Sequence, residues 1–298
     1  MITAVDCTII RFKDVMLPEF FVYYSRSKQY ERSIGNSTTG TTRKRISRKN
    51  LESILVPTPL FPDQERIVAE LDLLQGIIDK QKAQLKELDT LAQSIFYDMF
   101  GTTLTEKGWV VKSLGNLGTF QRGGGFLKSD YVDNGFPCIH YGQIHTKFSI
   151  ATFRHLTSIP EALAKTKSKM AATGDVILAI TSEDVEGSCK CTAWMGNYPV
   201  AVGGHTAIFK HTLNPIYAAY TFKSEPFQKA KEKYAHGFKV VEIKPSDIAS
   251  ISVCVPPRPL QDKFADSIVL IERQKASINA SIAETQKLFD YTMDKYFG

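Results

Sequence analysis

The chain has 298 residues, of which 43% are hydrophobic and 23% charged, and its formal net charge is +6. This is the composition of a globular protein with room for two domains. It has no apolar run of membrane-spanning length and no basic-then-apolar leader, and its five cysteines are scattered. We therefore expect a cytoplasmic protein with reduced thiols, not a membrane protein or a disulfide-stapled secreted one.

The first segment, residues 1–56, is strongly basic in its second half. Residues 26–50 hold eight Lys/Arg against one acid, Glu31. The densest part of this surplus consists of Arg43, Lys44, Arg45, Arg48 and Lys49. Such a cluster suits contact with phosphates, although a basic segment is also an ordinary solvated surface.

Residues 57–107 predict a long helix and a linker. The prolines Pro57, Pro59 and Pro62 stiffen the approach, and an apolar seam with alternating spacings of four and three follows. The seam reads Ile67, Leu71, Leu74, Ile78, Gln81, Leu85, Leu88, Ala92, Ile95, Met99. A helix of this length needs a long partner to cover its seam.

Residues 108–256 predict one α/β domain. The run at 174–180 has the composition of a buried strand, and 214–234 has the pattern of a helix with Pro215 in its first turn. Lys229, Lys231 and Lys233 fall late in that helix, where a solvated basic face is expected.

Residues 257–298 predict a second long helix that repeats the first. Residues 1–101 align with residues 198–298 without a gap. The alignment pairs Pro18 with Pro215, Gln64 with Gln261, and the Phe-Gly at 100–101 with the Phe-Gly at 297–298. It indicates an internal duplication with a period of 197. The second seam reads Phe264, Ile268, Ile271, Lys275, Ile278, Ile282, Thr285, Phe289, Thr292, Tyr296. We expect the two helices to pair with each other as a coiled coil. Residues 1–56 match only the last third of 108–256, so we expect a partial first domain.

Three stretches carry a family resemblance: GTTRKRISRKNLESILVPTPLFPDQERIVAELDLL at 40–74, SIFYDMFG at 94–101, and GWVVKSLGNLGTFQRGGG at 108–125. They resemble the specificity subunits of type I restriction-modification systems, and the resemblance covers essentially the whole chain. It implies an α+β fold in which target-recognition domains alternate with two long antiparallel helices, and each domain reads half of a bipartite DNA site.

The resemblance also implies the partners. They are double-stranded DNA, adenine methyltransferase subunits docked on the helices and their flanking turns, and nuclease-translocase subunits. S-adenosylmethionine, ATP and magnesium would belong to those partners, so this chain is expected to have no cofactor and no catalytic site. Residues 1–56 would be a partial recognition domain, 57–107 and 257–298 the helical regions, and 108–256 the complete recognition domain. The docking residues implied by the repeated turns are Pro59, Pro62, Gln64, Pro256, Pro259 and Gln261.

For a DNA reader, the polar residues of 108–256 are the candidates for contact. Gln121 and Arg122 precede three glycines that let a backbone approach phosphate, and side chains of the run 141–147 alternate polar with apolar, as on a strand or loop facing a groove. Gln pairs well with adenine, Arg with guanine and Lys with phosphate. The candidates are Gln121, Arg122, Lys128, Tyr141, Gln143, His145, Lys147, Ser182, Lys190, His205 and Lys239.

Other chemistries have weaker support. Asn214-Pro215-Ile216-Tyr217 is similar to a methyltransferase loop, but a helix start explains it. Glu242-X-Lys244 lacks the partner acids of a nuclease site, and Cys189-X-Cys191 lacks the second pair that structural zinc requires. Two alternatives stay open, a coiled-coil assembly protein and a silent partial specificity subunit. The sequence also leaves open whether two copies associate as a homodimer.

Overall fold

The computed structural model describes residues 7–40, 44–237 and 240–298. The chain divides into two compact units, one formed by residues up to 88 together with 273–298, and the other by residues 89–272. We call them unit 1 and unit 2 and describe each by itself.

Unit 1 is helical in its described residues. Its elements are α1 (Pro18–Tyr24), α2 (Lys28–Ser37), α3 (Arg48–Glu52), the first part of α4 (Phe61–Phe100) and the last part of α10 (Arg258–Phe297). Side-chain caps set two of the starts: Ser27 accepts from the Tyr30 N–H, and Ser47 from the Asn50 N–H.

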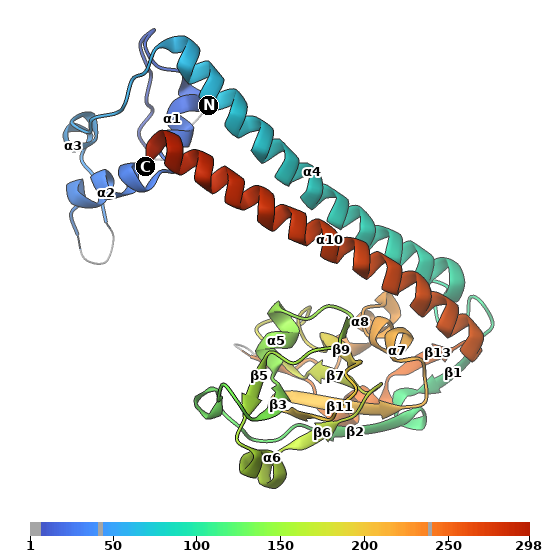
Figure 1. The fold of residues 1–298 in the computed structure, drawn as a ribbon. Coiled ribbons are helices and arrows are strands. Elements are labelled where there is room, and N and C mark those ends of the chain that lie inside the picture. Colours follow the sequence, from blue (N-terminus) through green and yellow to red (C-terminus); the bar gives the residue numbers. More distant parts are fainter. Residues whose placement is uncertain (1–6, 41–43, 238–239) are drawn as a thin grey trace. The chain divides into compact units, whose positions relative to one another are not determined.

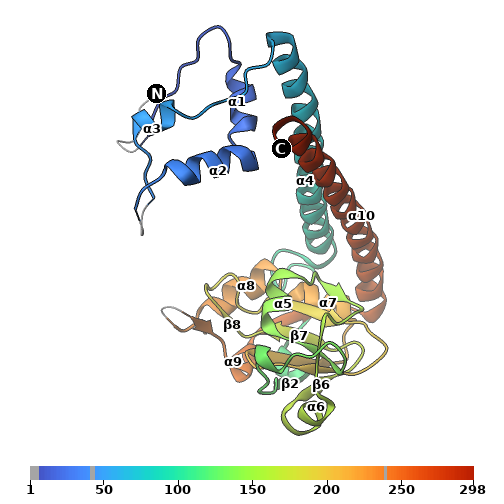
Figure 2. The ribbon, with the colours of Figure 1, turned by 60° about the vertical axis from the view of Figure 1, so that its left-hand side comes forward.

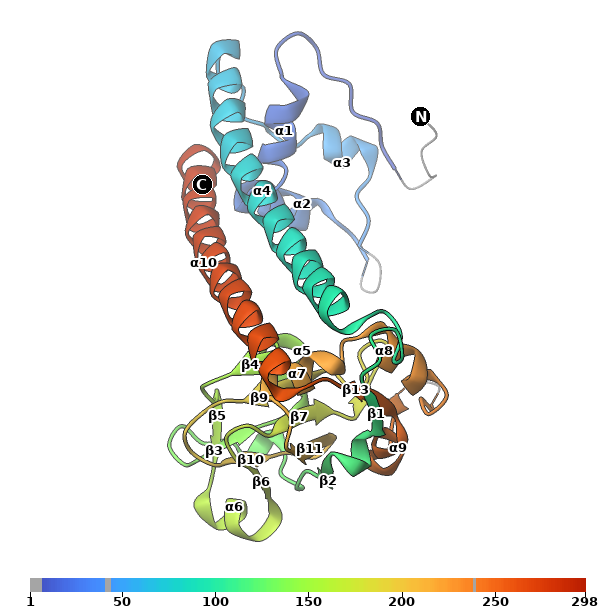
Figure 3. The same ribbon diagram turned by 90° about the vertical axis from the view of Figure 1, so that its right-hand side faces the viewer.

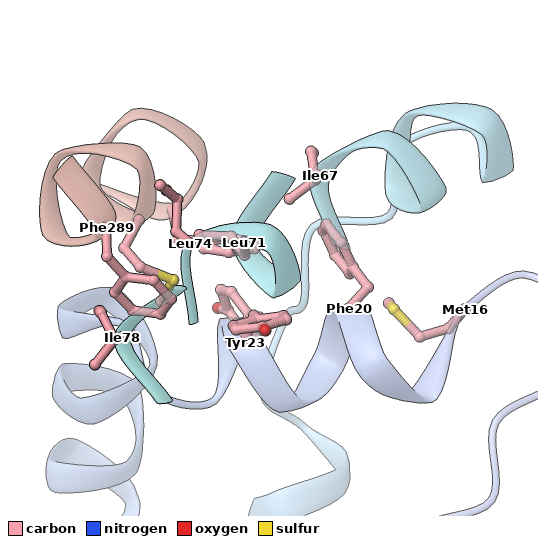
Figure 4. Packing of buried hydrophobic residues seen from close by; sticks show 11 residues of the cluster. Met16, Phe20, Tyr23, Ile67, Leu71, Leu74, Ile78 and Phe289 are labelled. Atoms are coloured by element: carbon pink, nitrogen blue, oxygen red, sulfur yellow. The ribbon is translucent and has the colours of Figure 1, made fainter. Parts of the chain in front are cut away.

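The core of unit 1 forms where α1 meets the two long helices (Figure 4). Met16, Phe20 and Tyr23 point toward the face of α4 that carries the predicted seam, and Phe289 of α10 closes the cluster. Leu71 is fully buried there. Burial of each such side chain stabilises the unit by roughly 1.5–3 kcal/mol.

The long helices run antiparallel in both units (Figures 1 and 3). In unit 1, Arg66 donates to the Tyr296 hydroxyl at 2.9 Å and Gln81 donates to Ser281 at 2.7 Å. In unit 2, the rings of Phe96 and Phe264 lie 5.4 Å apart. The predicted pairing of two long antiparallel helices is confirmed. Together with the sheets of unit 2, it also confirms the α+β class. Neither helix, nor any other in the described residues, is apolar enough over a sufficient length to cross a membrane.

Unit 2 is built on mixed sheets. The five-stranded sheet has the order β2-β11-β7-β9-β4, the four-stranded sheet has the order β5-β3-β10-β6, and β1-β13 and β12-β8 form two-stranded ribbons. The strands are β1 (Val110–Ser113), β2 (Gly118–Arg122), β3 (Phe136–Ile139), β4 (Ala151–Thr152), β5 (Thr157–Ile159), β6 (Lys169–Ala171), β7 (Val176–Ala179), β8 (Thr181–Ser182), β9 (Cys191–Trp194), β10 (Val200–Val202), β11 (Thr206–His211), β12 (Val241–Glu242) and β13 (Ser252–Val255). Only β3–β10 and β4–β9 are parallel pairs.

The predicted buried strand at 174–180 is confirmed as β7, which lies between β11 and β9 at the centre of the larger sheet. All four of its side chains are buried, which explains the continuous apolar run in place of an alternating one.

The helices of unit 2 cover the sheets and lead into the long helices. They are α5 (Tyr141–Thr146), α6 (Glu161–Lys167), α7 (Pro215–Thr221), α8 (Glu225–Glu232) and α9 (Pro245–Ser250), with short 3-10 turns η1 (Leu114–Asn116) and η2 (Lys128–Asp130). The single helix expected at 214–234 is two helices, α7 and α8. Ser224 is the N-cap of α8 and Pro226 follows in its first turn, where a continuing helix would clash.

Several local structures recur at an offset of 197. The bounds of α1 and α7, and those of α4 and α10, differ by 197 at both ends. The isolated bridge Thr39–Arg45 has its equal in His236–Glu242. The duplication itself stays a prediction, but these positions are structurally equivalent within their own units.

Candidate nucleic-acid interface

A cleft in unit 2 lies between α5 and the loop that follows β8. It has a volume of about 580 Å³ and is lined by residues from both ends of α5, by residues of the segment 181–190 and by Val240. We call it the α5 cleft; Figure 2 labels α5 and β8, the two elements beside it.

Four of the predicted DNA-contact residues line this cleft. They are Tyr141, His145, Ser182 and Lys190. His145 Nε2 lies 3.2 Å from the Thr181 carbonyl oxygen, which fixes α5 against β8. Polar side chains from two distant parts of the sequence therefore meet at one opening.

His205 joins this group from the loop before β11. Its Nδ1 lies 3.1 Å from Thr181 Oγ1, and its ring centroid is 5.5 Å from that of Tyr141. His205 is exposed and has a φ of 63°, a left-handed conformation that a non-glycine residue adopts only where its surroundings hold it.

Arg122 is linked to the cleft through Glu242, whose register partner Thr181 lines it. Its guanidinium pairs with Glu242 at 2.9 Å, and β12, which contains Glu242, is hydrogen-bonded to β8. Both side chains are about half exposed, at 52% and 40%. An exposed pair of this kind is weak, so Arg122 can exchange its carboxylate partner for a phosphate or a guanine edge.

A buried lysine outside the predicted DNA-contact set shapes the loop of the cleft. The Lys231 ammonium donates to the carbonyl oxygens of Glu186 at 3.0 Å and Ser188 at 2.6 Å. Only 1% of Lys231 is exposed, and burial lowers the pKa of its amine. The expectation of a solvated face fits Lys229, which is exposed and pairs with Glu225, but is wrong for Lys231, because α8 turns that side chain under the loop.

The cleft also has an acidic lining that was not among the residues predicted from the sequence. Glu183, Asp184 and Glu186 all contribute to it. Their signal is the run Ser-Glu-Asp-Val-Glu-Gly directly after a buried strand, a place where functional loops are common. Asp184 Oδ1 accepts from the Gly187 N–H at 2.6 Å, whereas no such turn bond is described for the side chains of Glu183 and Glu186. A carboxylate there can accept from the amino group of cytosine.

Gln143 occupies a structural position. The segment 141–147, expected as a strand or loop, is the helix α5, and Gln143 is 5% exposed at its first turn. Its amide oxygen accepts from the His140 N–H at 3.2 Å, and its amide nitrogen donates to Thr157 at 3.1 Å. Since both ends of the amide are used inside the unit, we leave Gln143 out of the proposed contact set.

The remaining candidates lie outside the cleft. Gln121 is half-buried in β2, opposite Ile208 of β11, and Lys147 is an exposed C-cap of α5. Lys128 is exposed in η2 and lies close enough to His140 for its charge, together with burial, to lower the pKa of that imidazole. Lys239 lies outside the described residues.

The glutamines of the repeated proline turns act within the chain. Gln64 accepts from the Leu17 N–H and donates to the carbonyls of Val15 and Pro59, all at 2.8 Å. Gln261 accepts from the Asn214 N–H at 2.9 Å and donates to Pro256 at 2.8 Å. Each joins the start of a long helix to the start of α1 or α7. Pro62 and Pro259 are exposed in the first turns of α4 and α10, while Pro59 is half-buried and Pro256 buried.

The motifs of the rival chemistries have structural roles. Asn214 caps α7 by accepting from the N–H groups of Ile216 and Tyr217. The thiol of Cys138 bonds Thr157, and that of Cys191 donates to the Ala219 carbonyl. All five cysteines are free, and no group of three potential metal ligands occurs among the described residues.

No protein-family model matches the chain. It is 22% identical over 278 residues to the specificity subunit of the type I restriction enzyme MjaVIII of Methanocaldococcus jannaschii, an alignment that covers 87% of this chain and 65% of that protein. It is 19% identical over 302 residues to the MjaIX specificity subunit of the same organism, covering 95% and 69%. The chain thus spans about two thirds of the length of these relatives.

Solved structures agree in fold. An S subunit of a type I restriction-modification system from M. genitalium matches with a TM-score of 0.56 at 13% identity, covering 96% of this chain and 74% of that one. A chain from a structural study of assembly and conformational transition in a type I R-M system matches with a TM-score of 0.53 at 21% identity, covering 94% and 70%. The resemblance to type I specificity subunits inferred from the sequence is confirmed.

Proposed function

We propose that this chain is a DNA-binding specificity subunit of a type I restriction-modification complex. The observation that carries the proposal is its similarity to two specificity subunits along 87% and 95% of its length. In this proposal residues 108–256 form a complete target-recognition domain and residues 1–56 part of another. The helical regions 57–107 and 257–298 act as the spacer between these two domains.

The α5 cleft is the proposed base-reading site. Tyr141, His145, Ser182, Glu183 and His205 supply donors, acceptors and a ring, and Arg122 and Lys190 supply positive charge at its edge. Phosphate contacts would give most of the affinity, and the cleft residues would give the selectivity.

The partners follow from the same proposal. Adenine methyltransferase subunits would dock on the long helices and on exposed prolines such as Pro62 and Pro259, and nuclease-translocase subunits would join through them. The chain itself would bind no S-adenosylmethionine, ATP or magnesium and would catalyse no reaction.

The test is selection of bound duplexes from a random pool, followed by titration of the selected duplex and a scrambled one. We expect His205→Ala to weaken binding to the selected duplex by about tenfold or more, with little change for the scrambled duplex, because a lost base contact costs roughly 1–3 kcal/mol. Lys190→Gln should weaken both duplexes and reduce the salt slope by about one.

The matched control is Lys165→Gln, which changes a lysine on α6 that is also exposed but absent from the cleft lining. It should leave affinity and salt slope unchanged. Failure to enrich any sequence, or equal effects of Lys190→Gln and Lys165→Gln, would contradict the proposed site. Absence of salt-dependent duplex binding would favour the assembly-protein alternative.

A further inference from the structure

The lining of the α5 cleft carries more acid than base. Glu183, Asp184 and Glu186 contribute to it, against the single lysine Lys190 of that lining. Such a lining is unfavourable for a phosphate, because like charges repel at short range. A duplex presents neutral base edges as well as charged phosphates, and an acidic surface discriminates between the two.

A further acid, Glu242, holds the arginine of the proposed contact set. Arg122 Nη2 lies 2.9 Å from Glu242 Oε1. A guanidinium has five N–H donors arranged around a planar fork, more than one carboxylate can use. Arg122 can therefore keep Glu242 as a partner and still donate to a second acceptor.

The ion pair is placed by paired strands. Arg122 ends β2, which pairs with β11, and the N–H of the following Gly123 donates to the Thr206 carbonyl at 2.9 Å. Glu242 lies in β12 opposite Thr181 of β8, and Thr181 lines the cleft. Long-range strand pairing thus brings the carboxylate to the arginine beside the proposed reading site.

The local fold does not require an acid at position 242. The equivalent residue of unit 1 is Arg45, which forms the isolated bridge Thr39–Arg45 where unit 2 has His236–Glu242. The same backbone position therefore accepts a cation in one unit and a carboxylate in the other. The half-exposed pair with Arg122 also contributes little to stability. These observations connect the charge of Glu242 with binding rather than with folding.

We propose that Glu242 is a specificity-determining positioning residue, which orients Arg122 toward a guanine edge and disfavours a phosphate there. Guanine O6 and N7 are neutral acceptors that match the guanidinium fork, whereas a phosphate would bring a second negative charge beside the carboxylate. Glu242 thus weakens sequence-independent binding more than it weakens base reading. This inference rests on the proposed function and adds that Arg122 reads a G·C pair.

The test compares Glu242→Gln with Glu161→Gln, each titrated with the selected and the scrambled duplex over a range of salt concentrations. Glu161 is a matched control, because it is an exposed acid of unit 2 that also pairs with a cation, Lys165, and is absent from the cleft lining. We expect Glu242→Gln to tighten binding of the scrambled duplex by about fivefold and to raise its salt slope by about one, as Arg122 gains a phosphate. Binding of the selected duplex should not tighten, and Glu161→Gln should change neither duplex.

A double-mutant cycle shows whether the effect passes through the arginine. In the Arg122→Gln background, Glu242→Gln should affect the scrambled duplex no more than Glu161→Gln does. Repeating the duplex selection with Arg122→Gln should relax the preference at one G·C pair. A purely structural role of Glu242 would move neither the coupling nor the salt slope.

Several outcomes would overturn this inference while the proposed function stands. They are an unchanged scrambled duplex in Glu242→Gln, an equal effect of Glu242→Gln with and without Arg122, and a consensus that keeps every G·C preference in Arg122→Gln. Failure of the unaltered chain to enrich any sequence would instead contradict the proposed function, and this inference with it.

Discussion

The Lys231 ammonium joins α8 to the loop of the α5 cleft by donating hydrogen bonds to two carbonyl oxygens of that loop. A buried charged group is costly unless it is hydrogen-bonded, and here the carbonyls of Glu186 and Ser188 satisfy it. The same bonds place Glu186 and Lys190 on the wall of the cleft. Lys231 is thus a positioning residue for the proposed interface.

Replacing Lys231 with Met tests that role. We expect the variant to lose roughly 1–3 kcal/mol of unfolding free energy, since the buried carbonyl of Ser188 and the part-buried carbonyl of Glu186 lose their donor. Hydrogen exchange of residues 183–190 should accelerate, and affinity for the selected duplex should fall. Lys229→Met, two residues away on the same helix but exposed, should change stability by less than about 0.5 kcal/mol. Unaltered exchange in the loop of Lys231→Met would contradict the positioning role.

At the scale of elements, the long helices are held by different contacts along their lengths. The seam residues Leu71, Leu74 and Ile78 of α4 are buried in unit 1. In unit 2, Phe96 and Phe100, which lie beside the predicted seam, are buried too, because they pack on Tyr217 and Tyr220 of α7 as well as on Phe264 of α10. A helix that meets a globular layer needs a wider apolar face than one in a two-helix pair.

Leu71→Ala and Leu73→Ala compare the two faces of α4 within unit 1. Leu71 has no exposed surface, so its truncation should cost about 2–5 kcal/mol, whereas Leu73 is 66% exposed and should cost less than about 0.5 kcal/mol. Thermal unfolding by calorimetry measures both. Equal shifts of Tm would mean that the seam does not pack as described.

At the scale of the whole molecule, the two units share one local arrangement of a proline turn, a short helix and the end of a long helix. In each, a glutamine of the proline turn bonds the start of a short helix, and an aromatic side chain at the end of a long helix packs on that short helix. Phe297 lies 5.2 Å from Phe20 in unit 1, and Phe100 lies 4.9 Å from Tyr217 in unit 2. Only unit 2 has described strands that close the core beside that arrangement.

Co-expression with an adenine methyltransferase subunit tests the proposed function of the complete chain. We expect the two proteins to co-purify and methylated adenines to map to one recurring motif, absent when the methyltransferase is expressed alone. A palindromic bipartite motif would mean that two copies of 108–256 read together, and an asymmetric one that unit 1 contributes. Failure to co-purify would remove the docking role of the helices, and a stable complex without methylation would identify a silent subunit.

The sequence by itself determined the features that depend on local periodicity. The heptad spacing predicts two long helices, and the apolar seam that each helix must cover predicts that they pair, while the family resemblance implies that the pair is antiparallel. The repeated turns predict that Gln64 and Gln261 are equivalent. The family resemblance also rests on such local runs. These features can be read from the sequence because each depends on residues that lie a few positions apart.

Only the tertiary structure decided which polar residues share a site. Tyr141, Ser182 and His205 meet because α5 packs on β7, because β8 follows β7 along the chain, and because β11, which begins just after His205, pairs with β7. No spacing in the sequence encodes that meeting. The burial of Gln143 and Lys231 follows from the same long-range packing. The sequence does not distinguish a polar side chain that faces water from one that bonds a buried carbonyl. The bonding partner comes from elsewhere in the chain, and only the folded structure shows it.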